Sequence, residues 1–410
     1  MLDVCDRDSL HPVDDVIETL LSLIKIAPRS EILPLPQALA HILREPVNAA
    51  FDVPPWDNSA MDGYALNSQD LVNNSASLPI AGRIAAGDSP DQTLPSGCCM
   101  RIFTGAPLPQ GADTVVAQEE VQLEDDLAIF SQVKVGQHVR KKAESTVAGA
   151  PLLDTGTRLR PQELGMLASQ GYDEVQVYRP LRIGLLSSGD ELTSPGETLN
   201  AGQIYDVNRY SLGALFRNWG FEVTDYGIMP DNLLATRDIL AKASQVQDIL
   251  ISSGGVSVGE EDHLKQAVED LGELNLWRVA MQPGKPIAFG TIQQTPWFGL
   301  PGNPAAALIT ALIIARPVLL RAQGMLDVLP QSVTLPADFN WHKAKPRQQY
   351  LRARVKTLDN GTTAVEVNAQ QGSAILQASC WADGLAVIKP NTTLNKGDLV
   401  TFIPMSILTS

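Results

Sequence analysis

Cysteine, histidine and basic residues are scarce in this chain of 410 residues, which has four cysteines, five histidines and 31 basic against 46 acidic residues. The cysteines show neither the spacing of a zinc site nor the density of a disulfide-stabilised secreted protein. The scattered histidines argue against a histidine metal centre. The net charge of −15 argues against a nucleic-acid partner, because binding to phosphate backbones draws on clustered Lys and Arg.

Long apolar runs are also missing. Residues 1–10 carry four charged side chains and no apolar run, so we expect neither a signal peptide nor a membrane anchor there. The most apolar stretch, 305–314, is shorter than a membrane span and is followed by Arg316 and Pro317. We therefore expect a soluble cytoplasmic protein with no membrane partner.

A chain of this length is expected to fold as about two to four domains, and its apolar pattern changes along the sequence accordingly. Apolar residues recur at helical spacing from about 12 to 26, which predicts an amphipathic helix. Short β-rich runs between turn residues indicate a compact β-rich module from 47 to 140. Strand and helix patterns alternate from 181 to about 326, which is typical of a layered α/β domain with helices on both faces. The strand-rich remainder predicts a small β-barrel or sandwich.

A first polar site lies between residues 52 and 65. Two prolines fix the backbone there, and small polar residues with Asp62 follow beside a glycine. Such a loop presents a carboxylate and free amides to a ligand. A stiff turn capped by Asp57 or Asn58 is the alternative interpretation.

Polar turns also follow two predicted strands of the α/β region. The sequence Ser-Ser-Gly-Asp-Glu at 187–191 comes directly after one strand, and the glycine-rich turn 252–259 follows another. Ligands of open α/β sheets bind beyond the carboxyl ends of the strands. The glycine-rich turn is suited to cradle phosphate, while Asp262 after it is suited to hold a divalent cation. A strand-to-helix turn with an Asp cap is the alternative at 187–191.

Two Pro-Gly turns complete the set of candidate sites. The turn at 283–286 contains Lys285, the natural partner of an anion, and an exposed lysine without a ligand is the alternative. The turn at 299–304 opens a long helix whose N-terminal amides favour an anion. Carboxylates for a cation and glycine-rich turns for phosphates together indicate a phosphorylated small-molecule ligand.

Five motifs stand in an order that resembles the MoeA family, to which the gephyrin E domain also belongs. The resemblance runs from about residue 12 to residue 410, and the motifs occupy residues 54–65, 101–107, 253–259, 283–286 and 299–304. It implies a multidomain α/β plus β fold with four domains. These are a layered α/β molybdopterin-binding domain (11–29 and 180–328), a connecting domain (30–48 and 149–179), an inserted β-rich module (49–148) and a C-terminal β-barrel-like domain (329–410).

The resemblance also implies a function in molybdenum cofactor biosynthesis. Such enzymes take adenylylated molybdopterin and molybdate, use Mg2+, release AMP and leave molybdenum on the dithiolene of molybdopterin. They are homodimers whose active clefts are shared between subunits. Transient contact with the molybdopterin adenylyltransferase and with molybdoenzyme-maturation proteins is implied as well.

Carried over position by position, the resemblance implies catalytic acids at Asp62, Glu191, Asp231 and Asp262, and Mg2+ on Asp231 and Asp262. The implied substrate-binding residues are Thr104, Ser257, Arg278, Lys285, Pro301, Arg352 and Ser373. Arg352 and Ser373 are the expected donors to molybdate, because a carboxylate cluster cannot itself attract an anion. An exposed strand arginine is the alternative for Arg352.

The chain departs from the family pattern at three places. Arg278 and Gln282 stand where lysines are usual, and Ala143-Glu144-Ser145 replaces Gly-Glu-Asp after the basic run. The alternative from another class is a dimeric molybdopterin-binding scaffold without turnover, although a scaffold could dispense with the acids. Adenylyl transfer is the other enzymatic alternative, but that activity belongs to a single short domain.

Overall fold

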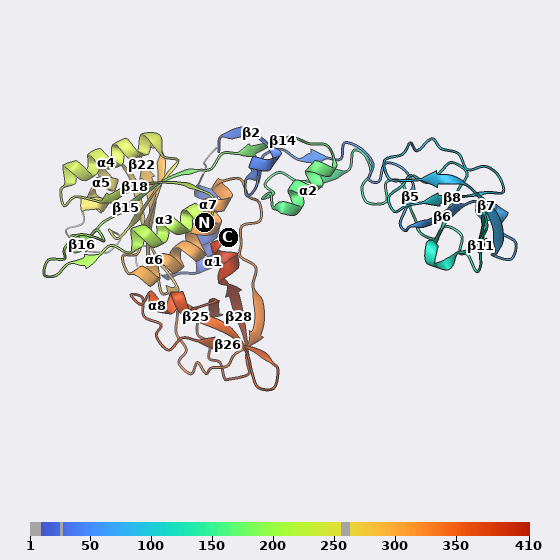
Figure 1. The fold of residues 1–410 in the computed structure, drawn as a ribbon. Helices are drawn as coiled ribbons and strands as arrows, with labels where there is room; N and C mark the ends of the chain where they lie inside the picture. Colours follow the sequence, from blue (N-terminus) through green and yellow to red (C-terminus); the bar gives the residue numbers. More distant parts are fainter. Residues whose placement is uncertain (1–9, 25–27, 256–262) are drawn as a thin grey trace. The chain divides into compact units, whose positions relative to one another are not determined.

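The computed structural model describes residues 10–24, 28–255 and 263–410. They form two compact units (Figure 1). The first unit comprises Met1–Arg44, Thr155–Arg160 and Glu174–Ser410, and the second comprises Glu45–Asp154 and Pro161–Asp173. Each unit is described by itself below.

The first unit is built on a mixed sheet, in which the described residues supply seven strands in the order β1-β20-β22-β23-β19-β15-β18. Strands β15, β18, β19 and β23 run parallel to their neighbours in this group, whereas β22 is antiparallel to both β20 and β23. The three strands predicted around 181–186, 222–228 and 248–252 are thereby confirmed. The strands are β1 (Leu10–His11), β15 (Arg182–Ser187), β18 (Glu222–Ile228), β19 (Ile249–Ser253), β20 (Gly272–Val279), β22 (Pro286–Ile292) and β23 (Thr295–Leu300).

Helices cover both faces of this sheet, as the apolar pattern predicts (Figure 1). On one face Val16, Phe216 and Leu319 belong to one buried cluster with the strands, and on the other face Leu240 and Leu264 belong to a second. The amphipathic helix predicted at 12–26 is α1, which ends at Leu23. The helices are α1 (Val13–Leu23), α3 (Asn208–Asn218), α4 (Leu233–Val246), α5 (His263–Leu271), α6 (Pro304–Thr310) and α7 (Arg316–Ala322).

The most apolar helix lies in the core of this unit. Helices α6 and α7 continue into one another through a π-helical turn, Ala311–Ala315. In the described part of the chain, residues 304–322 alone are long and apolar enough to cross a membrane, but 89% of their apolar window is buried inside the protein. Packing against the sheet therefore accounts for its composition.

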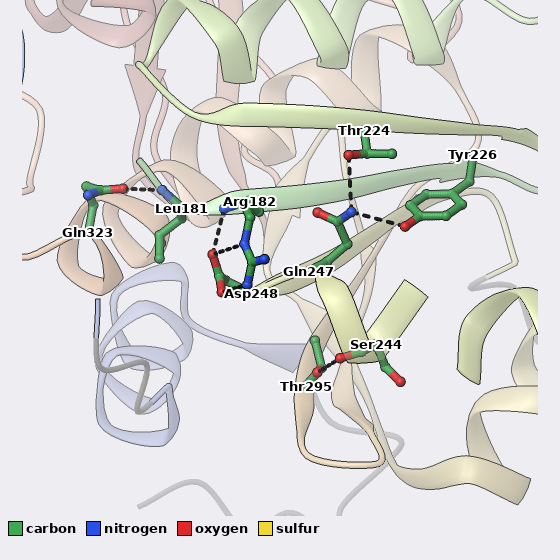
Figure 2. A network of polar contacts seen from close by, with 9 residues as sticks. All are labelled: Leu181, Arg182, Thr224, Tyr226, Ser244, Gln247, Asp248, Thr295 and Gln323. Atoms are coloured by element: carbon green, nitrogen blue, oxygen red, sulfur yellow. Dashed lines mark hydrogen bonds and ion pairs between the residues drawn. The ribbon is translucent and has the colours of Figure 1, made fainter. Parts of the chain in front are cut away.

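Polar side chains are paired with one another where β15 and β19 begin (Figure 2). The Arg182 guanidinium donates to both carboxylate oxygens of Asp248, at 3.1 and 2.8 Å, and the Leu181 amide donates to Gln323 at 2.7 Å. Gln247 donates to the hydroxyls of Thr224 and Tyr226. Burial alone would raise the pKa of the Asp248 carboxyl, but the bonds from Arg182 outweigh it and lower that pKa.

A β-rich region follows α7 and confirms the strands predicted after residue 326. Its sheet has the order β21-β25-β27-β28-β24, with β26 paired to β25. Strand β21 comes from the segment between β20 and β22, so the sheet is continuous with the α/β region in the backbone. The elements are β21 (Met281–Gln282), β24 (Val333–Pro336), β25 (Gln348–Thr357), β26 (Thr363–Val367), β27 (Gly384–Ile388), β28 (Leu399–Pro404), α8 (Gln377–Trp381) and α9 (Met405–Thr409).

The second unit is the predicted β-rich module together with α2 (Pro161–Ser169). Its sheet has the order β10-β11-β7-β8-β6-β9. Neighbouring residues Tyr64 and Ala65 belong to two different apolar clusters, which shows that both faces of this sheet are buried. The strands are β6 (Gly63–Leu66), β7 (Ala76–Ile84), β8 (Cys99–Ile102), β9 (Thr114–Ala117), β10 (Gln122–Glu124) and β11 (Leu127–Phe130).

Candidate active site

A cavity of about 1330 Å3 opens in the first unit at the carboxyl ends of four neighbouring parallel strands. Residues that follow β15, β18, β19 and β23 line it, in the segments 188–192, 229–231, 254–255 and 301–304. The carboxyl ends of parallel strands meet at one edge of the sheet, so turns that are distant in sequence converge there. The sequence prediction that these turns form a ligand site is consistent with this convergence.

Close backbone packing requires glycine in the turn after β19. Gly254 has a φ of 84°, and a Cβ there would lie 2.2 Å from the Ser188 carbonyl oxygen. The Gly254 amide donates to the Leu300 carbonyl, and the Ser188 amide donates to the Ser253 carbonyl, both at 3.0 Å. Three strand ends are thus held together by main-chain contacts, which leaves the following side chains free to face the cavity.

The turn that carries Lys285 is fixed in a similar way. Gly284 has a φ of 106°, and a Cβ there would lie 2.2 Å from the hydroxyl of Thr310 on α6. The Lys285 carbonyl accepts from the Val279 amide at 2.8 Å, while the side chain lines the cavity. Its amine makes no ion pair within the described parts of the chain. A fixed backbone and a free cation suit an anionic ligand.

Exposed carboxylates face the same cavity. Glu191 and Asp231 line it, and the Oδ1 atom of Asp231 lies 3.2 Å from Nε2 of His263, the first residue of α5. The predicted residues Asp262 and Ser257 lie outside the described residues. Among residues 10–24, 28–255 and 263–410, no three His, Cys, Asp or Glu side chains form a group that could hold a metal by themselves.

The available oxygens nonetheless fit the way Mg2+ binds in phosphate sites. That ion keeps several waters and is usually held by one or two carboxylates together with phosphates of the substrate. Asp231 is 66% exposed, so its side chain can exchange His263 for such an ion. A complete protein cage is not needed for this role.

The β-rich C-terminal region contributes Ser373 to the cavity wall but does not contribute Arg352. Arg352 is fully buried, which excludes the interpretation as an exposed strand arginine. Its Nη2 donates to the carbonyls of Gln370 and Gly372, at 3.2 and 3.0 Å, and the Gln371 side chain bonds both to its amide and to its carbonyl. Burial lowers the pKa of Arg352 to about 10. Arg352 therefore holds the loop that presents Ser373.

The remaining expected substrate residues of the first unit differ in position. Pro301 lines the cavity directly after β23. Arg278 does not line it, because it lies on β20, where it pairs with Pro286 of β22. The structure thus brings Lys285, Pro301 and Ser373 together with the acids, and it places Arg278 beside the turn rather than in the wall.

Asp62 and Thr104 form a preformed pair in the second unit. Both the amide and the hydroxyl of Thr104 donate to Oδ1 of Asp62, each at 2.8 Å. The amide bond is the main reason why the pKa of Asp62 is lowered, and the hydroxyl adds to it. The residues that line the cavity all belong to the first unit.

Three family models together match most of the chain. They are described as the MoeA N-terminal region (domain I and II), a probable molybdopterin binding domain and the MoeA C-terminal region (domain IV), and they match residues 11–171, 184–321 and 334–405. The molybdopterin molybdenumtransferase of Haemophilus influenzae is 36% identical over 97% of this chain and 99% of its own length. The chain belongs to the MoeA family. The enzyme of the same name from a Nostoc species is also 36% identical, over 96% of this chain and 95% of its own.

Solved structures agree with this MoeA membership. A crystal structure of the molybdopterin biosynthesis MoeA protein from Pyrococcus horikoshii OT3 has a TM-score of 0.82 and 25% sequence identity, over 97% of this chain and 100% of that one. A second crystal structure of a Pyrococcus MoeA protein has a TM-score of 0.76 and 29% identity. The fold class predicted from the sequence is therefore confirmed.

The structure shows the conformation or the contacts of two residues that depart from the MoeA pattern. Ala143 has a φ of 62°, a conformation that glycine adopts without strain. Gln282 lines the cavity, and its Oε1 accepts from Nη2 of Arg347 at 3.2 Å. Where a lysine is usual, the side-chain amide of Gln282 therefore accepts a hydrogen bond from the guanidinium of Arg347.

Sequence reasoning missed Asp206, Asn208 and Arg347, which also line the cavity. Asp206 is 1% exposed and Asn208 is 6% exposed, and each has a side-chain oxygen without a partner among the described residues. They lie where β17 (Ile204–Tyr205) leads into α3. An acid between a strand and a helix is the signal that could have identified them.

Proposed function

We propose that this chain is a molybdopterin molybdenumtransferase, which inserts molybdenum from molybdate into adenylylated molybdopterin and releases AMP. The observation that carries the proposal is the cavity itself, where glycine-rich strand ends, exposed carboxylates and Lys285 converge in a chain of the MoeA family. Phosphates, a divalent cation and an oxyanion are the ligands that such a set of groups binds.

Each side chain has a separate part in this proposal. Lys285 and the amides of Gly302 and Asn303 bind the substrate phosphates, and Ser373 donates to molybdate. Arg352 positions the Ser373 loop through its bonds to Gln370 and Gly372. Asp231 and Asp262 would hold Mg2+, which neutralises charge on the phosphate oxygens when it is bound.

We infer that the active form is a homodimer whose clefts combine the cavity of one subunit with the Asp62 loop of its partner. The support is that Asp62 and Thr104 form a ready-made acid and hydroxyl pair, whereas the residues lining the cavity come from the other unit alone. Mixing an Asp62→Asn variant with an Asp231→Asn variant should restore activity, because one cleft of the mixed dimer is intact. No recovery despite demonstrated subunit exchange would point to sites built within single chains.

The experiment that tests the function incubates purified protein with adenylylated molybdopterin, Mg2+ and molybdate. Release of AMP together with cofactor that activates a molybdoenzyme apoprotein is the expected result. Binding of the substrate without AMP release would favour the dimeric scaffold instead.

We further infer the setting of this activity. The proposal places the protein in the cytoplasm, with transient contacts to the molybdopterin adenylyltransferase that supplies its substrate and to proteins that mature molybdoenzymes. The four domains with the boundaries given above remain part of the proposal, and the compact unit of residues 45–154 and 161–173 overlaps the proposed β-rich module.

A further inference from the structure

We propose that Asp206 and Asn208 recognise the N–H edge of the pterin ring of the substrate. This rests on the proposed function, in which the ligand of the cavity is adenylylated molybdopterin. Both side chains line the cavity, they are 1% and 6% exposed, and each has one oxygen without a hydrogen-bond partner among the described residues. Two acceptor oxygens in a cavity wall require a ligand that donates hydrogen bonds to them.

Main-chain contacts fix the segment that carries the Asp206 carboxylate. Strand β17 pairs in parallel with β16 (Leu192–Thr193), and the Asp206 amide donates to the Thr193 carbonyl at 2.9 Å. The Oδ1 atom of Asp206 accepts from the amide of Arg209, in the first turn of α3, at 3.2 Å. This contact accounts for one carboxylate oxygen and leaves Oδ2 for a ligand.

The bond at the other end of the Asn208 amide group fixes its orientation. Its Nδ2 donates to the Gly302 carbonyl at 2.7 Å, so Oδ1 is the atom that lacks a partner. A reversed amide would place two acceptor oxygens against each other. Because Gly302 belongs to the turn proposed to bind the substrate phosphates, this bond holds the free oxygen next to that turn.

Apolar side chains of the same segment suit the faces of a flat ring. Ile204, Tyr205 and Val207 line the cavity and are 55%, 41% and 37% exposed. The hydroxyl of Tyr205 donates to the Glu197 carbonyl at 3.0 Å, which restrains the tyrosine ring. Apolar side chains beside a few placed polar groups are typical of a site for an organic ligand.

The pattern of hydrogen-bond donors distinguishes the two ring systems of the substrate. A pterin presents its amino group and the neighbouring ring N–H side by side, so its edge offers two donors. Adenine presents one amino group, and the ring nitrogens near that group are acceptors. Two free acceptor oxygens therefore match the pterin. A site of this kind rejects an analogue that lacks a matching donor, because its own oxygens then stay unpaired.

Fluorescence titration of the full chain with pterin and with lumazine, in buffer without divalent cations, tests this assignment. Lumazine has the same two rings with a carbonyl in place of the amino group. The wild type should bind pterin about 10- to 100-fold more tightly, which is the scale of a lost hydrogen bond to a charged group. Asp206→Asn should abolish most of this preference, because it replaces an acceptor oxygen with an N–H donor of the same size.

Two further variants keep the test independent of how well one protein folds. Asn208→Ala removes the second acceptor and should also reduce the preference for pterin. Tyr205→Ala removes an exposed ring, so it should weaken binding of pterin and lumazine by a similar factor and leave their ratio unchanged.

Asp225→Asn is the matched control, because Asp225 also contacts Arg209, at 3.2 Å, and does not line the cavity. It should keep the preference for pterin. Equal affinities of the wild type for the two rings would overturn the proposal, as would an unchanged ratio in the folded Asp206→Asn or Asn208→Ala protein or an equal loss in Asp225→Asn.

Calorimetric titration with AMP separates the pterin from the adenine of the substrate. Asp206→Asn should leave AMP binding near that of the wild type. A loss of AMP binding with pterin binding unchanged would overturn the assignment, since the free oxygens would then face the adenine. Because the readout is binding, a wild-type protein that prefers pterin and releases no AMP would contradict the proposed function and leave this assignment intact.

Discussion

The two ends of the central sheet differ in how far their polar side chains are paired with one another. Where β15 and β19 begin, Arg182 and Asp248 form a two-pronged ion pair, and the Leu181 amide is bonded to Gln323 (Figure 2). Where the same strands end, the hydroxyls of Ser187 and Ser252 are buried and have no partner among the described residues. One side-chain oxygen each of Asp206 and Asn208, in the adjoining cavity wall, is also buried without a partner among the described residues.

The difference indicates that one end of the sheet serves mainly the stability of the fold and that the other end serves ligand binding. A buried polar group that lacks a partner destabilises the folded state, so natural proteins pair nearly all of them. At the end where β15 and β19 begin, most polar groups follow this rule, although Oε1 of Gln247 has no partner among the described residues. At the other end, Asp206 and Asn208 depart from it in the cavity wall, where a ligand can supply the missing bonds, and functional sites are where such departures are expected.

The largest effect should come from Asp231 at the open end. Asp231→Asn keeps the shape of the side chain but removes the charge, and we expect AMP release to fall by roughly 1000-fold, because a metal ion supplies several kcal/mol of charge stabilisation. The melting temperature should change little, since the side chain is mostly exposed.

His263→Gln is the control for Asp231, because it removes the imidazole whose Nε2 lies 3.2 Å from Asp231 while it keeps the carboxylate. We expect it to lower the rate by less than about tenfold, because an exposed polar contact of this kind contributes little. Equal rates for the two variants would mean that Asp231 acts through its contact with His263 and not as a ligand of a metal ion.

A backbone substitution should distinguish the packed strand ends from an open turn. Gly254→Ala places a Cβ 2.2 Å from the Ser188 carbonyl oxygen in addition to straining a positive φ, so we expect a loss of about 2–3 kcal/mol in the free energy of unfolding. Gly87→Ala has a similar φ of 93° with no atom near its Cβ and should cost about 1 kcal/mol. Chemical denaturation measures both, and equal losses would show that the close packing adds nothing.

The paired end should respond to pH through Asp248. Its pKa is lowered in the folded protein, so its charge stabilises the fold above its ordinary pKa of 3.8 and ceases to do so as the pH falls through the folded value. Asp248→Asn should therefore lower the free energy of unfolding by about 1 kcal/mol at pH 7, where the partly exposed pair is screened. The gap to the wild type should shrink from about pH 5 to pH 3.

A constant gap for Asp248→Asn over that pH range would mean that the ionised carboxylate is not the stabilising group. Catalytic activity of this variant should stay near that of the wild type, because Asp248 lies at the end of the sheet opposite the cavity strand ends.

The smallest effect concerns Asp62 in the β-rich module. Thr104→Val removes the hydroxyl bond and keeps the amide bond, so the pKa of the Asp62 carboxyl should rise towards its ordinary value and remain below it. A titration of this carboxyl by carbon NMR measures the change directly. A pKa identical to that of the wild type would show that the hydroxyl of Thr104 does not help to lower the pKa of Asp62.

Much of this arrangement could be predicted from the sequence, because its signals are local. The apolar runs at 181–186 and 248–252 predicted β15 and β19, and the polar turns directly after them are among the segments that line the cavity. Helix α1 followed from its spacing of apolar residues, although Leu23 ends it before residue 26.

The parts that could not be predicted depend on pairing over long distances in the sequence. Arg347 reaches the cavity because β21 pairs with β25, and no local pattern at 347 indicates that register. Arg352 has the alternation of a strand residue, but the loop that returns through Gly372 buries it. The position of each arginine therefore became visible only when the two segments lay side by side.

Hydrogen–deuterium exchange with and without AMP and Mg2+ tests the central claim most directly, because it reads both ends of the sheet in one measurement. Binding at the carboxyl ends should slow exchange in the segments 188–192, 229–231 and 301–304 that line the cavity. Amides at the amino ends, such as Arg182, should exchange as before. Protection at the amino ends, or none in the cavity segments under conditions where AMP binds, would contradict the account.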